Sequence, residues 1–148
     1  MRDVPVGRLA GGVTLVGAGC AITGSFLPWI EATDPASGTT LTRAGIEGHY
    51  AMLIDLLALI AGVIGGFVMV RRTAGAVLGI TLAILAAVQL GIVIFVGSNL
   101  SRGVVQLQEA GAVAGLGTGI YLTGLGAVIA LVAGVLAFRK LPLQTPTA

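Results

Sequence analysis

His49–Arg72 reads HYAMLIDLLALIAGVIGGFVMVRR, and this stretch decides the fold of the chain. About 20 apolar residues, each rising about 1.5 Å along a helix, cross a hydrocarbon core of about 30 Å. The run opens with two polar-tipped rings, closes with two arginines and holds one carboxylate, Asp55. The pattern predicts a membrane-spanning helix over residues 50–70.

The composition places the whole chain in the membrane class. Of its 148 residues, 56% are hydrophobic and 9% are charged, whereas soluble domains carry about 25% charged residues. Three further apolar runs predict spans over 9–30, 73–97 and 117–138. We therefore expect an all-α membrane protein, with one antiparallel four-helix transmembrane domain over 1–140 and a disordered cytoplasmic tail over 141–148.

The first apolar run resembles a secretion signal, because Arg2 and Arg8 precede it. The run continues past Cys20 as far as Pro28 and Trp29, which is too long for a cleaved signal. We expect an uncleaved first span that Pro28 ends or bends. Cys20 is the only cysteine, so no intrachain disulfide can form and a cysteine-ligated zinc site is excluded.

Two loops join the spans on the predicted outer side. In the first, Glu31–Gly48, a turn cluster at 34–38 precedes the β-prone Thr39–Thr42, which predicts a short hairpin against Trp29–Thr33. In the second, residues 98–116, the first half can prolong the third span as an amphipathic helix.

The charges predict the orientation. Positive residues collect on the cytoplasmic side of membrane proteins. Six basic residues fall on one side, namely Arg2, Arg8, Arg71, Arg72, Arg139 and Lys140, and only Arg43 and Arg102 fall on the other. We expect a plasma-membrane protein with both termini in the cytoplasm. Three aromatic residues near span ends, Trp29, Tyr50 and Tyr121, are predicted interfacial anchors.

Small residues recur at every fourth position of the spans. Such stripes let helix backbones approach closely in lipid, although 24 glycines in the chain would also produce some by general richness. The pattern favours a tight bundle without a wide pore. The predicted packing positions are Gly62, Gly66, Gly75, Gly79, Ala83, Ala87, Gly91, Gly126, Ala130 and Gly134.

Each predicted span places one polar side chain in the outer third of the membrane: Ser25, Asp55, Gln89 and Thr123. One interpretation is a site around Asp55 that responds to protons or ions, or a polar pocket for a lipid head group. The plainer interpretation is ordinary hydrogen bonding between helices, worth about 1 kcal/mol each. A third is contact between Asp55 and a helix of another protein.

Other chemistry has little support in the sequence. Glu47, His49 and Asp55 could ligate a metal, but a lone histidine at the interface is more often an anchor. No serine or cysteine has a base and an orienting partner, and Gly117-Thr118-Gly119 lacks the preceding strand of a phosphate loop. We expect no enzyme activity, no cofactor and no metal. The basic residues lie at the ends of apolar runs, so we expect no nucleic-acid partner.

Three short motifs carry a resemblance to a known group: Pro28-Trp29, Gly45-Ile46-Glu47-Gly48, and GTGIYLTGLG at Gly117–Gly126. With these, the chain resembles the small four-span membrane proteins of actinobacteria, which implies the topology and little else. The larger first outer loop is also similar to that of claudin-type tetraspans, but their paired loop cysteines are missing here.

The sequence favours a non-catalytic accessory or scaffolding subunit of a larger cell-envelope or energy-transducing complex. Its expected partners are the lipid bilayer and other membrane subunits or further copies of itself. Two alternatives are a small ion-coupled transporter with Asp55 as the titrating residue and a lipid-binding membrane module.

Overall fold

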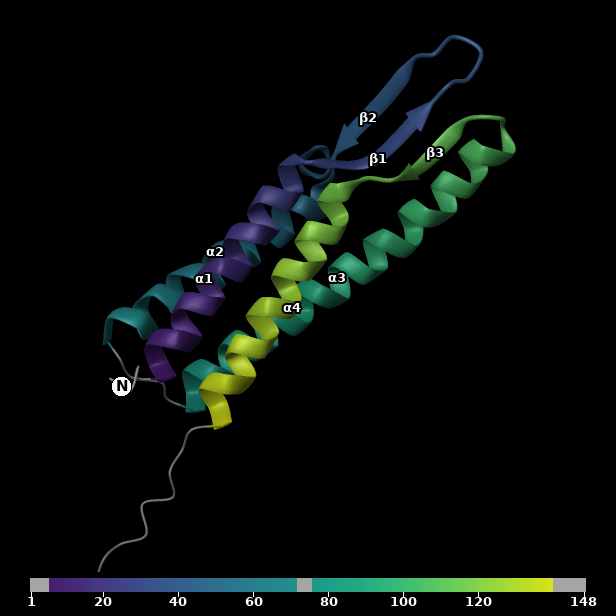
Figure 1. The fold of residues 1–148 in the computed structure, drawn as a ribbon. Helices are drawn as coiled ribbons and strands as arrows, with labels where there is room; N and C mark the ends of the chain where they lie inside the picture. Colours follow the sequence, from purple (N-terminus) through teal and green to yellow (C-terminus); the bar gives the residue numbers. More distant parts are fainter. Residues whose placement is uncertain (1–5, 72–75, 140–148) are drawn as a thin grey trace, which may run out of the picture.

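The computed structural model describes residues 6–71 and 76–139 as four long helices with a small sheet at one end (Figure 1). The helices are α1 (Val6–Phe26), α2 (His49–Arg71), α3 (Ala76–Glu109) and α4 (Thr118–Arg139). Each is long and apolar enough to cross a membrane. The predicted all-α membrane fold is confirmed, and the chain is a multi-pass membrane protein. The tail predicted over 141–148 lies outside the described residues.

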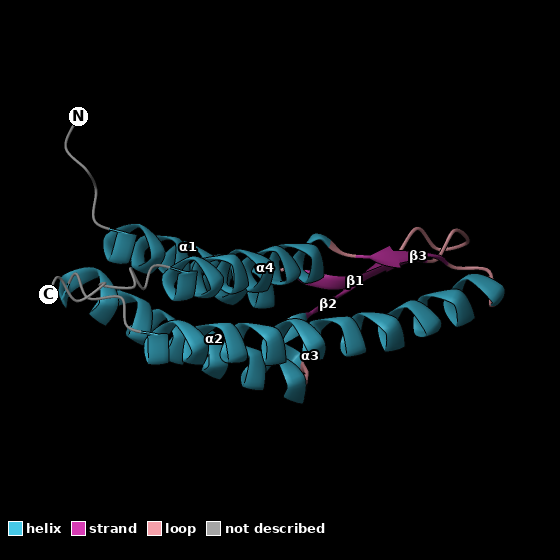
Figure 2. Cartoon of the chain, turned by 90° about the horizontal axis from the view of Figure 1, so that it is seen from below, coloured by secondary structure: helices cyan, strands magenta, loops and turns pink. Residues whose placement is uncertain are grey.

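The helices form a four-membered ring in the order α1, α4, α3, α2, and α2 and α3 contact each other least. Seen from below, α1 and α4 form one layer and α2 and α3 the other (Figure 2). The first residue of α1 and the last of α4 lie at the end opposite the sheet (Figure 1). All outer connections therefore meet at the sheet end.

Small residues allow three of these helix pairs to meet backbone to backbone. Between α1 and α4, a Cβ added at Gly126 would lie 2.6 Å from the backbone nitrogen of Ala21. Between α3 and α4, a Cβ at Gly134 would lie 2.6 Å from the backbone nitrogen of Ala83. Between α1 and α2, a Cβ at Gly65 would meet Thr14 at 2.8 Å. No real side chain fits at these distances, so the close approach depends on glycine.

The predicted packing positions divide into two groups. Six lie inside or against the bundle: Gly62, Gly79, Ala83, Gly126, Ala130 and Gly134. By contrast, Ala87 and Gly91 lie on an exposed face of α3, and a Cβ added at Gly66 or Gly91 would meet nothing within 4 Å in the described part of the chain. Gly75 lies outside the described residues. The prediction that Gly66, Ala87 and Gly91 pack within the bundle is wrong.

The reason is the period of the helix. A step of four residues turns an α-helix by about 400°, which is about 40° more than a full turn. Three such steps, from Gly79 to Gly91, rotate the stripe by about 120°, away from the neighbouring helices. The buried line of α3 instead alternates steps of three and four residues, through Leu82, Ala86, Gln89, Val93 and Val96.

The first span ends earlier than predicted. Helix α1 stops at Phe26, and Pro28 begins strand β1 (Pro28–Thr33). A proline disfavours helical backbone at the residue before it, so the helix ends ahead of Pro28 rather than continuing to Ile30. The predicted hairpin is confirmed: β1 pairs antiparallel with β2 (Thr40–Ala44), with Thr33 opposite Thr40.

A third strand was not predicted. Strand β3 (Val113–Leu116), from the second loop, pairs with the other edge of β1 and gives the order β2-β1-β3. Its four residues are too short and too rich in small side chains to give a strand signal by themselves. The two outer loops therefore make one sheet across the end of the bundle.

Helix α3 extends far beyond its neighbours. The ring of Tyr50, at the start of α2, packs edge-on against Phe95 with centroids 6.0 Å apart. Fourteen residues of α3 follow Phe95, which is about 21 Å of helix beyond the start of α2. This part runs alongside β3 (Figure 1), and the Gln108 amide donates to the Ala114 carbonyl at 2.7 Å. The helical prolongation of the third span thus supports the sheet.

Candidate functional site

The intramembrane carboxylate lies between α1 and α2. The Ser25 hydroxyl donates to Asp55 Oδ2 at 2.9 Å, and it also lies 2.7 Å from the Ile22 carbonyl oxygen. Its single proton can serve only one of these acceptors at a time. Asp55 Oδ1 is buried and has no hydrogen-bond partner among the residues that the structure describes. Ser25 therefore holds the Asp55 carboxylate in place through one oxygen, while the other oxygen has no hydrogen-bond partner within the described residues.

Asp55 also borders a groove of about 430 Å³ on the outside of the bundle. The groove is otherwise apolar; its remaining lining residues are Ile22, Phe26, Ile46, Met52, Leu56 and Leu59. A carboxylate at the edge of an apolar groove can contact a hydrogen-bond donor or a cation that enters from the lipid side.

The four predicted polar residues do not form one site. Thr123 is buried, donates to the Gly119 carbonyl at 2.8 Å and lies 3.4 Å from the Ala21 carbonyl oxygen. Gln89 is only 2% exposed, and its side-chain nitrogen has no partner within the described ranges. Of the four, only Ser25 and Asp55 hydrogen-bond to each other.

Helix geometry explains this separation. Successive residues of an α-helix point about 100° apart. Ile54 belongs to the core cluster with Val93 and Val96 of α3, so that side of α2 faces α3. Asp55, the next residue, points instead toward α1. Similar depth in the membrane therefore does not bring Asp55 and Gln89 together.

Trp29 is not an interfacial anchor, contrary to prediction. Its side chain is 4% exposed, and its indole N–H donates to the Gly24 carbonyl at 2.9 Å. Because α1 ends at Phe26, Trp29 lies on β1, and its indole belongs to the outer core cluster with Ile54 and Ile120. Tyr50 and Tyr121 are exposed, as interfacial residues would be.

The three short motifs of the resemblance meet at this tryptophan. Gly45 lies directly against the indole, where an added Cβ would overlap the ring, and a Cβ at Gly119 would lie 2.6 Å from Trp29 Cδ1. Gly117 donates its amide to the Trp29 carbonyl at 2.9 Å. The motifs thus have a packing role: Gly45, Gly117 and Gly119 from two of them lie against Pro28 and Trp29 of the third.

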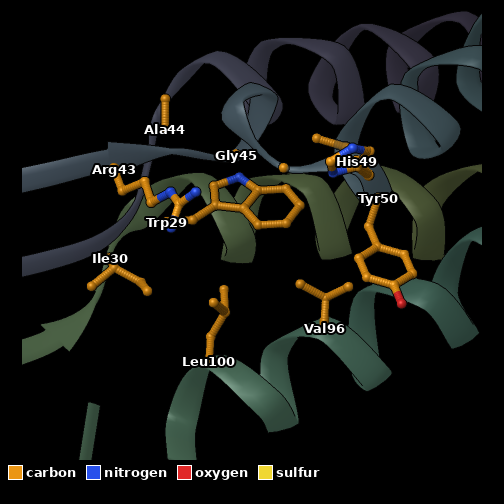
Figure 3. A pocket seen from close by; sticks show the side chains of 11 residues that line it. Trp29, Ile30, Arg43, Ala44, Gly45, His49, Tyr50, Val96 and Leu100 are labelled. Atoms are coloured by element: carbon orange, nitrogen blue, oxygen red, sulfur yellow. The ribbon is translucent and has the colours of Figure 1, made fainter. Parts of the chain in front are cut away.

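A second cavity lies beneath the sheet, with a volume of about 280 Å³ (Figure 3). Sequence reasoning missed it because five separate segments of the chain build it. Its lining comes from β1 (Trp29, Ile30), β2 (Arg43, Ala44), the following turn (Gly45, Gly48), α2 (His49, Tyr50, Ala51) and α3 (Val96, Leu100). The pocket therefore combines an aromatic and aliphatic interior with two basic side chains.

The sheet register brings Arg43 to this pocket. Arg43 pairs with Ile30 across the strands, and paired residues project from the same face of a sheet. Its Nε lies 3.5 Å from Glu47 Oε2, in an exposed ion pair. Such a pair contributes little to stability, so Glu47 orients the guanidinium without occupying all of its donors.

The hairpin turn carries a further charged group outside the membrane. The hydroxyl of Ser37 and the amide of Ala36 donate to the Asp34 carboxylate at 2.7 and 2.9 Å. The Ser37 bond first, and the Ala36 bond after it, hold the pKa of Asp34 below its usual value. This is the role of an Asx turn, which stabilises the hairpin.

Neither a metal centre among the described residues nor a matching family indicates the chemical class of the site. Within 6–71 and 76–139, no three His, Cys, Asp or Glu side chains gather as a metal site would need. Comparison of the sequence with protein-family models and with curated proteins finds no match. The function is therefore argued from the geometry alone.

Proposed function

We propose that this protein is a non-catalytic accessory or scaffolding subunit of a larger membrane complex, and that its sheet and the outer end of α3 contact the partner. We place it in the plasma membrane with both termini in the cytoplasm. The predicted charge asymmetry supports this orientation, because the sheet end carries Arg43 and Arg102, while Arg8, Arg71 and Arg139 lie in the opposite ends of the helices.

One observation carries the proposal: large apolar side chains are exposed on the sheet and on the part of α3 that extends past the start of α2. Leu41 on β2 is 72% exposed and Val113 on β3 is 68% exposed. Val105 and Leu107, on the outer end of α3, are exposed as well. Apolar side chains gathered outside a membrane span are typical of contact with another protein.

Both edges of the sheet add to this surface. The order β2-β1-β3 leaves β2 and β3 each with one unpaired edge among the described strands. An unpaired edge can accept a strand of another chain, with main-chain hydrogen bonds supplying affinity. Leu41 and Val113 lie on these two edge strands, so each edge offers both backbone groups and an apolar side chain.

The test is co-purification of the tagged full chain from its native membrane in mild detergent. We expect a defined partner protein with the wild type and a loss of about tenfold or more with the double variant Leu41→Ala, Val113→Ala, since interface anchors cost 1 kcal/mol or more each on truncation. Leu59→Ala removes the same side chain from an exposed position of α2 within the membrane and should leave recovery unchanged. Equal recovery with the Leu41→Ala, Val113→Ala double variant and with Leu59→Ala would exclude the sheet as the contact surface.

A second candidate is an ion-coupled transporter, which the incompletely satisfied Asp55 carboxylate favours. A transporter requires that Asp55→Asn abolishes flux in proteoliposomes while the variant still folds and inserts. Glu31→Gln is the matched control, because Glu31 is an exposed carboxylate on β1. Under the subunit proposal, Asp55→Asn alters only assembly or stability.

A further inference from the structure

We propose that the cavity beneath the sheet binds an anionic phospholipid from the adjoining leaflet. The phosphate would lie at Arg43, His49 would add a basic group on the other side of the indole, and the first part of one acyl chain would lie against Trp29, Val96 and Leu100. The inference does not depend on the proposed subunit function, because none of the exposed side chains Leu41, Val113, Val105 and Leu107 lines the cavity.

The position of the cavity fits a lipid. It lies between the start of α2 and the middle of α3, the pair of neighbouring helices that contact each other least. Tyr50, an exposed aromatic residue at the start of α2, marks this level as the membrane boundary. A lipid can enter sideways here without leaving its own leaflet.

The charges at the rim are complementary to a phosphate. In Figure 3 the Arg43 guanidinium lies beside the Trp29 indole, with His49 on the far side of the ring. Arg43 has five N–H donors, of which the Nε faces Glu47, so its two terminal nitrogens can donate to a phosphate. An imidazole donates from at least one nitrogen in either protonation state. The first amides of α2, at His49 and Tyr50, add the positive end of the helix dipole.

The interior selects an amphiphile over a soluble anion. Trp29, Ala51 and Val96 are buried members of the outer core cluster, and Leu100 packs against it. In Figure 3, Val96 and Leu100 form the wall opposite the indole. These side chains can make apolar contacts with an acyl chain, but they provide no charge or hydrogen-bond donor for a free phosphate. A zwitterionic head group would bring a second positive charge next to Arg43, so we expect anionic lipid to bind more tightly.

Trp29 is itself the reporter, because it is the only tryptophan and lines the cavity. The full chain is reconstituted in phosphatidylcholine vesicles with rising fractions of phosphatidylglycerol that carries brominated acyl chains, which quench tryptophan on contact. Brominated phosphatidylcholine is the parallel series. We expect the phosphatidylglycerol series to quench Trp29 at a clearly lower lipid fraction.

The variants are chosen so that folding is not in question, since Arg43, His49 and Glu47 are all exposed. Each cation near a membrane surface contributes on the order of fivefold to the binding of anionic lipid. Arg43→Gln with His49→Gln should raise the half-quenching fraction by at least that factor, and Glu47→Gln should lower it. Arg102→Gln, which removes an exposed charge from α3 outside the cavity lining, should leave it unchanged.

Three results would overturn the inference. One is equal quenching by the two brominated lipids, or none by either. Another is a double variant that behaves as Arg102→Gln does. The third is relief of quenching when inorganic phosphate replaces chloride at equal ionic strength, which would identify a soluble anion as the ligand.

Discussion

At the scale of single residues, glycine decides how closely the helices approach. Gly126 and Gly134 lie on α4 with the backbones of α1 and α3 directly against them. Gly91 has the same sequence context, a small residue at a four-residue spacing, yet it lies on the exposed face of α3. Composition alone could not separate these positions, because the difference depends on where a four-residue step has rotated the face of the helix.

Two alanine substitutions separate these roles. Gly126→Ala should destabilise the bundle by about 1–3 kcal/mol, the usual cost of overpacking, because α1 must move away. Gly91→Ala should be neutral or stabilising by up to about 1 kcal/mol, since alanine is the better helix former. Unfolding of both variants by denaturant in the same detergent measures the difference. Equal effects would show that Gly91 packs as closely as Gly126.

At the scale of elements, the sequence predicted those helices and strands that are marked by the length of an apolar run or by a turn motif. Long apolar runs predicted four helices, and the turn cluster after β1 predicted the hairpin. The burial of Trp29 and the strand β3 were missed, because each depends on contact between loops far apart in the sequence. The end of α1 was placed too late, although Pro28 sets it locally. The cavity beneath the sheet was missed because it, too, depends on contact between segments far apart in the sequence. The sequence identified Ser25 and Asp55 as intramembrane polar groups, but it did not show that they hydrogen-bond to each other.

The hairpin turn should respond to acid. Asp34 has a folded-state pKa below the ordinary value of 3.8, so the unfolded turn binds its proton more readily. Its stabilising effect is therefore present above about pH 4 and is lost as the pH falls through the lowered folded pKa. The Ala36 amide resonance, followed by NMR, should shift with a midpoint below 3.8. Asp34→Asn should abolish this shift, and a midpoint at or above 3.8 would contradict the Asx-turn assignment.

At the scale of the whole molecule, the bundle carries a small platform at one end, made of the sheet and the outer end of α3. The sheet, the outer end of α3 and Trp29 form one packed unit, because β1 runs across the bundle and bonds to both outer loops. Both proposals place their ligands at this end: a partner protein at the exposed apolar side chains and a lipid in the cavity.

The proposed orientation can be read from cysteine labelling. In a Cys20→Ala background, Ser37→Cys on the hairpin turn should react with a membrane-impermeant maleimide in intact cells. Thr145→Cys near the C-terminus should react only after the membrane is opened. The reverse pattern would invert the topology and place the platform in the cytoplasm.

Native mass spectrometry tests the subunit proposal most directly. The full-length protein is released from its native membrane in mild detergent, and its mass is measured. We expect a defined complex that contains a second protein and that dissociates when Leu41 and Val113 are replaced by alanine. A mass that corresponds only to this chain, alone or as a homo-oligomer with bound lipid, would contradict the subunit assignment.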